Sequence, residues 1–230
     1  MTHKRSFDEV LPLYERMIEV FMEIELKYLI PDYDTAGKMW QQKVFERYGK
    51  IDSIKRIEMS AVYFDTADFI LSDVETAFRI RKEGDKVVAT VKWSGYNEEC
   101  LHEREEINIP LASSYDLGRP SLHIFNESKK GQELIQLVGD RELVPIMETD
   151  FIRNTMYIDT GKAICEAAMD VGKIVTHVGN EDIIELEIEL FSGDLKEIIS
   201  IGKELQNEFG LIPGEISKFG RGLELLKRYN

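Results

Sequence analysis

The chain has 230 residues, a net charge of −14, 43% hydrophobic residues and 31% charged residues. These values suit one large globular domain, or at most two small ones, with a sizeable core. The acidic excess argues against nucleic acid or an anionic membrane as the main partner. Two cysteines, Cys100 and Cys165, give neither a disulfide framework nor a metal motif. No signal peptide and no membrane-length apolar run is recognisable, so we expect a reducing, cytoplasmic location.

In chain order, the hydrophobic pattern first predicts an amphipathic helix over 6–19 and then a mainly β domain. We therefore divide the chain into a helical extension, 1–20, and a domain, 21–230. The expected strands are 21–30, 57–64, 76–83, 86–94, 101–109, 148–159, 162–171 and 182–191. The expected helices are 34–48, 127–138, 194–209 and 215–228. Short turns at Gly84-Asp85 and at 159–161 indicate antiparallel pairing.

The first and last of these strands carry an acidic residue at every second position. Glu23, Glu25 and Lys27 share one face of the first strand, and Glu185, Glu187 and Glu189 share one face of the last. Carboxylates two residues apart on a strand lie roughly 7 Å apart and repel each other. A hard divalent cation would relieve this repulsion, whereas a single strand of this kind could also be a solvated face of a sheet.

The strands between them also have one apolar face and one charged face. Arg79 and Arg81 alternate with Phe78 and Ile80, for example. Because four amphipathic helices need an apolar surface to cover, we predict an α+β fold built on a closed eight-stranded antiparallel β-barrel. Its charged faces line an inner tunnel and its apolar faces point outward under the helices. The alternative, a barrel with an apolar interior, leaves the helices without a partner surface.

An ordered series of short motifs follows these charged faces. They are Glu23-x-Glu25-x-Lys27, Tyr63-Phe64-Asp65-Thr66, Phe78-Arg79-Ile80-Arg81, Thr90-Val91-Lys92, Arg104 with Glu106, Arg153, Met169-Asp170, Glu185-x-Glu187-x-Glu189 and Ser217-Lys218 with Arg221-Gly222. The series resembles the CYTH superfamily, also called triphosphate tunnel metalloenzymes, over residues 21–230. The section from Glu185 to Gly222 is most similar to the bacterial inorganic triphosphatases. Two features depart from the family pattern: about 20 residues precede the first motif, and Arg153 is followed by uncharged residues.

The resemblance implies a role for each charged residue. The expected substrate-binding cations, which pair with phosphate oxygens, are Lys27, Arg79, Arg81, Lys92, Arg104, Arg153 and Lys218. The expected ligands of Mg²⁺ or Mn²⁺ are Glu23, Glu25, Glu185, Glu187 and Glu189. Glu23, Glu25, Lys27 and Asp170 are the expected catalytic residues, with Asp170 holding a metal ion or orienting water.

The function expected from this resemblance is metal-dependent hydrolysis of inorganic tripolyphosphate, a small-molecule substrate, with release of the terminal phosphate. If the chain assembles with itself, we expect a homodimer. Three alternatives remain open: a class IV adenylate cyclase, a thiamine or nucleoside triphosphatase on the same fold, and a non-catalytic polyphosphate-binding module. The cyclase would need an adenine pocket, and no sequence feature supplies one. The module would gain nothing from buried carboxylates.

Overall fold

The computed structural model of the protein describes residues 20–40 and 43–228. The helix expected over 6–19 lies outside the described residues, as does nearly all of the extension assigned to 1–20. No helix in the described part of the chain is long and apolar enough to cross a membrane.

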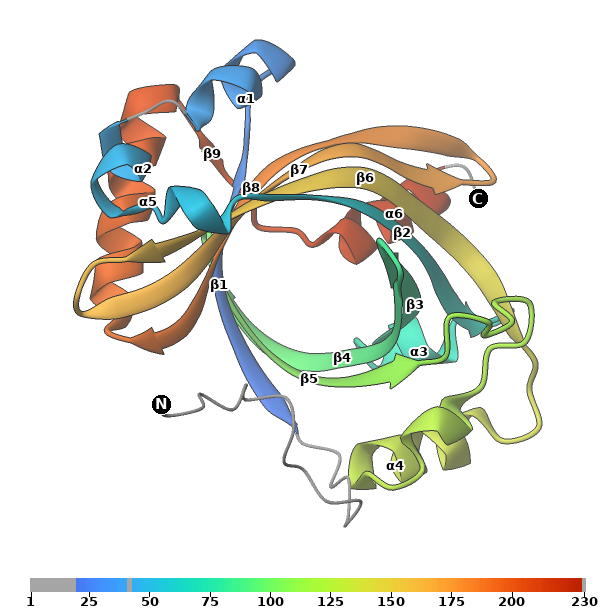
Figure 1. Ribbon diagram of the computed structural model, residues 1–230. Helices are drawn as coiled ribbons and strands as arrows, with labels where there is room; N and C mark the ends of the chain where they lie inside the picture. Colours follow the sequence, from blue (N-terminus) through green and yellow to red (C-terminus); the bar gives the residue numbers. More distant parts are fainter. Residues whose placement is uncertain (1–19, 41–42, 229–230) are drawn as a thin grey trace, which may run out of the picture.

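Eight antiparallel strands form a closed barrel, as predicted (Figure 1). In sheet order the ring runs β5, β4, β3, β2, β6, β7, β8 and β1, and it closes because β1 also pairs with β5. The strands are β1 (Phe21–Leu29), β2 (Lys55–Thr66), β3 (Ala77–Glu83), β4 (Lys86–Glu98), β5 (Leu101–Leu111), β6 (Leu143–Asp159), β7 (Ala163–Thr176) and β8 (Gly179–Gly193). A short ninth strand, β9 (Ile212–Pro213), pairs with the end of β1 and was not predicted.

The helices lie between the strands in chain order, and one predicted helix is corrected. The segment expected as a single helix over 34–48 instead contains two, α1 (Tyr33–Met39) and α2 (Lys43–Tyr48). The others are α3 (Ile70–Asp73), α4 (Lys129–Val138), α5 (Leu195–Phe209) and α6 (Lys218–Arg228), with short 3₁₀ helices at Ile51–Ser53 and Leu122–Phe125. Helix α5 begins after its cap, Asp194, whose side chain accepts a hydrogen bond from Lys196 N at 2.9 Å.

The outer surface of the barrel is apolar and lies under helices. On one side, Leu26 and Tyr28 of β1 pack with Ile198 and Leu205 of α5, and α1 and α2 join the same cluster. On another side, α4 covers the apolar faces of β3, β4 and β5 (Figure 1). This arrangement follows from strand alternation: each residue that packs under a helix is flanked by residues that point into the barrel.

One end of the barrel interior is also apolar, which the sequence analysis did not predict. Met147, Ile174 and Ile183 lie in a cluster with Leu225 and Leu226 of α6. Helix α6 therefore packs across this end of the barrel, against β7 and β8. The charged part of the interior lies beside this apolar end, and Lys218 at the start of α6 is positioned between the two.

Gly172 on β7 lies so close to the backbone of β6 that we expect a side chain there to destabilise the fold. A Cβ at Gly172 would lie 2.1 Å from Asp150 O and 2.4 Å from the Phe151 Cα, both backbone atoms of β6. We expect Gly172→Ala to lower the free energy of unfolding by about 1–3 kcal/mol, the usual cost of overpacking. Urea denaturation measures this, with Gly179→Ala as the control because nothing lies within 4 Å of its Cβ position. Equal stability of the two variants would contradict the packing described.

Candidate active site

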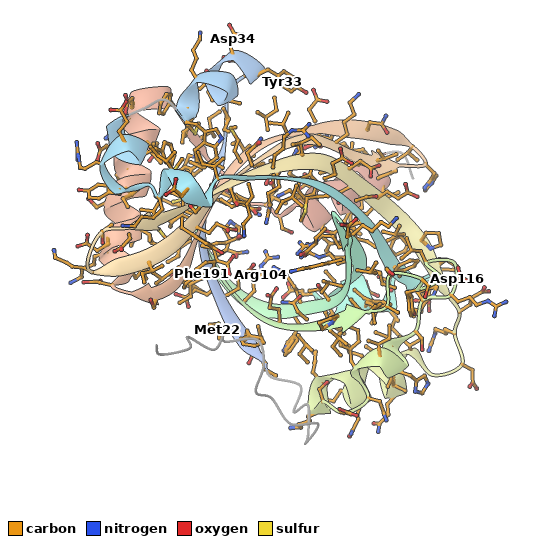
Figure 2. All side chains as sticks on the ribbon, viewed as in Figure 1. Met22, Tyr33, Asp34, Arg104, Asp116 and Phe191 are labelled. Carbon is orange, nitrogen blue, oxygen red and sulfur yellow. The ribbon has the colours of Figure 1, made fainter. Side chains whose placement is uncertain are left out.

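A cavity of about 260 Å³ lies inside the barrel and collects most of the predicted site residues. All seven expected phosphate-binding cations line it, from Lys27 on β1 to Lys218 on α6. Four of the five expected metal ligands line it as well: Glu23, Glu25, Glu187 and Glu189. Figure 2 shows the inward position of one of the cations, Arg104, within the barrel.

Strand register explains why residues so far apart in sequence meet here. Barrel closure places β1 between β8 and β5, so Glu25 lies opposite Glu189 and Lys27 lies opposite Glu187. On the other side of β1, Glu23 lies opposite Arg104. The two acidic runs are therefore neighbours, because closure of the predicted barrel pairs its first and last strands.

Glu187 is the centre of an ion-pair cluster. Its carboxylate lies 2.8 Å from Lys218 Nζ, 3.0 Å from Lys27 Nζ and 2.5 Å from Arg153 Nη2. Burial alone would raise the pKa of Glu187, but Lys218 and the other two cations outweigh it and hold that pKa well below its usual range. The three cations thus favour the ionised form of Glu187 and compensate its buried charge.

A second group of cations lies on β3 and β4. Lys92 Nζ pairs with Glu23 and lies 2.8 Å from Glu106 Oε2, while Arg81 pairs with Glu83. Arg79 donates a hydrogen bond to the Tyr63 hydroxyl at 3.3 Å, and its buried Nε has no partner among the described residues. Arg79 lines the cavity, and a guanidinium with an unsatisfied N–H is suited to donate hydrogen bonds to an anionic ligand.

Glu189 differs from the other carboxylates because it has no cation bound to it within the described part of the chain. Burial first, and then the neighbouring carboxylates of Glu23 and Glu25, raise the pKa of Glu189 to about 8. Its direct cross-strand neighbours are Glu25 on β1 and Glu166 on β7. Three carboxylates in one row suit a hard divalent cation in the charge and chemistry of their donors.

The described residues nevertheless contain no group of three or more Asp, Glu, His or Cys side chains arranged to hold a metal ion. The reason is visible in the ion pairs, because Glu23 is turned to Lys92 and Glu25 to Lys27, at 3.3 Å. The carboxylates therefore suit a divalent metal by their oxygen donors and by their positions along the strands. To bind a metal, Glu23 and Glu25 would have to give up their ion pairs with Lys92 and Lys27.

Glu185 and Asp170 do not line the cavity. Both are fully buried behind it, where Lys218 Nζ lies 3.0 Å from Glu185 and 2.8 Å from Asp170. Arg153 also donates two hydrogen bonds to Asp170, at 2.7 and 2.6 Å. The structure thus places these two carboxylates where they hold Lys218 and Arg153, and their predicted roles in metal binding and catalysis stay predictions.

A sequence model of the CYTH domain matches residues 22–223, most of the chain. The chain belongs to the CYTH domain family. It is similar to an inorganic triphosphatase from Haemophilus influenzae, with 29% identity over 160 residues. That alignment covers 70% of this chain but 44% of the relative, so the chain spans less than half of the relative's length.

Solved structures confirm the CYTH fold. A Hippeastrum protein described as a candidate adenylyl cyclase with a dominant triphosphatase activity superposes with a TM-score of 0.60 and 18% identity, over 86% of this chain and 93% of that one. A candidate adenylate cyclase from Bacillus halodurans gives a TM-score of 0.52 and 18% identity, over 86% and 95%. At these identities the likeness concerns the fold alone.

Several lining residues of this CYTH domain were not predicted. Phe151, Asn108 and Phe219 line the cavity, and the Phe219 ring stacks on Tyr63 at 5.4 Å between centroids. A signal was present for the first two, since Phe151 is two residues before Arg153 and Asn108 is four after Arg104, on the same strand faces. Phe219 had no such signal, because its position depends on how α6 docks.

Asp65, in the predicted motif Tyr63-Phe64-Asp65-Thr66, has a structural role. Asp65 Oδ1 accepts hydrogen bonds from Thr66 N at 2.7 Å and Leu71 N at 2.9 Å, and Oδ2 accepts one from Ser72 N at 2.9 Å. These bonds hold α3 against the end of β2. Tyr63 of the same motif, two residues earlier, points into the cavity instead.

The raised pKa of Glu189 predicts that the free energy of unfolding depends on pH. An acid whose folded-state pKa is about 8 holds its proton more tightly when folded, so its contribution to stability is lost as pH rises from about 4.5 towards 8. We expect the metal-free protein to lose stability between pH 5 and 8, and Glu189→Gln to flatten that loss by at least 1 kcal/mol. Denaturant titrations with chelator at pH 5, 6.5 and 8 measure it, and parallel curves would contradict the assignment.

Proposed function

We propose that this CYTH domain is a divalent-metal-dependent triphosphatase that hydrolyses inorganic tripolyphosphate. The observation that carries the proposal is one cavity lined by seven cations together with Glu23, Glu25, Glu187 and Glu189. Tripolyphosphate carries about four to five negative charges near neutral pH, and phosphoryl transfer relies on fixed cations that neutralise them. The similarity to an inorganic triphosphatase from Haemophilus influenzae supports the same substrate class.

The residues divide the work by chemistry. Arg79, Arg81 and Arg153 present planar forks that pair with phosphate oxygens, and Lys92 and Lys218 add point charges. The metal ligands would be Glu23, Glu25, Glu187 and Glu189, because their oxygens suit Mg²⁺ or Mn²⁺. Such a metal supplies charge neutralisation at phosphorus and an acidified water. The protein contributes mainly fixed positions, since the charged groups are already held by strands of a closed barrel.

The proposal also covers the class of substrate and the cellular location. We infer a small-molecule substrate rather than nucleic acid or membrane, because the net charge is −14 and the cations are gathered inside the barrel. A reducing cytoplasm suits the two cysteines, Cys100 and Cys165, which form no disulfide.

The test is a phosphate-release assay with tripolyphosphate, ATP and thiamine triphosphate, each with Mg²⁺, Mn²⁺ or chelator. We expect metal-dependent release from tripolyphosphate at the highest kcat/KM. Cyclic AMP from ATP in place of phosphate would favour the cyclase alternative. Tight binding of tripolyphosphate without turnover in either metal would instead favour a non-catalytic binding module.

Glu23→Gln tests the metal assignment within that assay. The amide keeps the shape of the side chain but removes the charge that would hold the metal, so we expect kcat to fall by about 10²-fold or more, about 2.7 kcal/mol in the barrier. KM for the metal–substrate complex should change much less. Glu148→Gln is the control, because Glu148 is exposed on β6 and outside the cavity. Turnover of Glu23→Gln within threefold of wild type at saturating metal would show that Glu23 is not a ligand.

A further inference from the structure

The chain between β9 and α6 leads from the side of β1 to the helix that covers one end of the barrel (Figure 1). We call residues 214–217 of this connection the strap. Its last residue, Ser217, lines the charged cavity, and so does Lys218, the first residue of α6. An interaction that fixes the strap therefore also fixes two residues of the proposed substrate site.

The strap is hydrogen-bonded to the barrel at its first residue. Gly214 N donates a hydrogen bond to Lys27 O at 2.9 Å, and the Gly214 carbonyl accepts one from His102 Nε2 at 2.7 Å. Glu215 and Ile216, which follow, are exposed and form no hydrogen bond within the described part of the chain. Gly214 is thus the last point at which the strap is hydrogen-bonded to the barrel strands before α6 begins.

His102 lies on β5, and its side chain is 1% exposed. Its Nδ1 has no hydrogen-bond partner among the described residues, so the bond to Gly214 is the single hydrogen bond of the ring there. Because a carbonyl oxygen can only accept, Nε2 carries a proton and donates it to Gly214. His102 does not line the charged cavity. The ring therefore acts on that site through the strap and not through direct contact with a substrate.

Gly214 also packs directly on the Lys27 side chain. A Cβ at Gly214 would lie 2.7 Å from Lys27 Cγ and 3.2 Å from Lys27 Cδ, so the strap can lie this close because the residue is glycine. Lys27 Nζ lies 3.0 Å from the Glu187 carboxylate, which Lys218 Nζ contacts at 2.8 Å. The strap thus covers the stem of one cation of the cluster and leads into the other.

We propose that His102 is a positioning residue of the triphosphatase site, because its hydrogen bond to Gly214 holds the strap on Lys27 and so holds both Lys27 and Lys218 in place. The inference rests on the proposed function for its effect on catalysis. Both cations would contact the anion in the ground state and in the transition state, so a loosened strap weakens substrate binding more than it slows the chemical step. A general loss of folded protein would instead lower the apparent kcat and leave KM unchanged.

Three substitutions of His102 test the hydrogen bond. His102→Leu removes the donor, and His102→Gln returns an amide N–H at about the reach of Nε2, whereas the amide of His102→Asn is one bond shorter. With tripolyphosphate and Mg²⁺ we expect KM to rise about fivefold in His102→Leu and in His102→Asn, with kcat within about twofold of wild type. In His102→Gln, KM should return to within about twofold of wild type. His177→Leu is the matched control, since His177 is exposed between β7 and β8 and does not line the charged cavity, and it should change neither constant.

Gly214→Ala approaches the same contact from the strap. The added Cβ would push the strap off the Lys27 stem, so we expect KM to rise here as well, with kcat again within about twofold of wild type. Combining it with His102→Leu should raise KM little beyond the larger single effect, because both changes release one contact. Effects on KM that multiply in the double variant would show that His102 and Gly214 act separately, which contradicts the proposal.

Hydrogen–deuterium exchange measures the strap without turnover. We expect the amides of residues 211–218 to exchange about threefold faster or more in His102→Leu than in wild type, while those of β6 stay unchanged. Unchanged exchange of the strap, a fall in kcat without a rise in KM, or no recovery of KM in His102→Gln would each overturn the proposal. If His102→Leu does not fold, His102→Asn provides the same comparison with His102→Gln. A wild type without turnover would refute the proposed function, and exchange together with calorimetric binding of tripolyphosphate would still decide whether His102 holds the strap.

Discussion

Mutual neutralisation of buried charges is the interaction on which the site depends. Glu187 contacts Lys27, Arg153 and Lys218, which come from β1, β6 and α6. A buried charge without a partner costs several kcal/mol, so each member of the cluster fixes the others in place. The same contacts join strands β1, β6 and β8 to helix α6, which covers one end of the barrel. Removing one carboxylate from this cluster would leave three cations short of a partner.

This arrangement has a consequence for binding. The cations that would bind an anion are paired with the carboxylates that would bind a metal, as Lys92 is with Glu23. An anion alone would strip cations from their carboxylates, and a metal alone would do the reverse. Both costs would fall if anion and metal bound together, because each would release the partners that the other needs. Among the charged residues that line the cavity in the described part of the chain, Glu189, Arg79 and Arg104 form no ion pair, whereas the others are paired.

Much of this architecture was predictable because strand alternation is a strict rule. Once Glu23, Glu25 and Lys27 are placed on one face, closure of the barrel fixes their neighbours, and all seven expected cations do line one cavity. What the sequence could not show depends on tertiary docking. The apolar end under α6, the burial of Asp170 and Glu185 behind the cavity, and the position of Phe219 all follow from where α6 packs. Hydrophobic periodicity identifies such a helix but does not say which surface it covers.

Local sequence patterns also failed to predict one helix boundary and one cavity. The break between α1 and α2 falls within a segment whose apolar spacing continues across it, so periodicity alone predicted one helix. Another cavity, next to the charged one, was equally hidden from the sequence, since its lining residues Ile216, Asn97 and Glu75 come from three separate segments with no shared pattern. Loops that meet only in the folded protein leave little trace in local sequence.

The most direct measurement is thermal unfolding with tripolyphosphate alone, Ca²⁺ alone and both together, using Ca²⁺ as a metal expected to bind without rapid turnover. A ligand at a hundredfold excess over its Kd stabilises the folded state by about 2.7 kcal/mol. We predict a rise in Tm with both that exceeds the sum of the separate rises by several degrees, and loss of that excess in Glu23→Gln and in the Arg81→Ala, Lys92→Ala double variant. Merely additive shifts, or an undiminished excess in those variants, would contradict a tunnel whose anion and metal sites are held in mutual ion pairs.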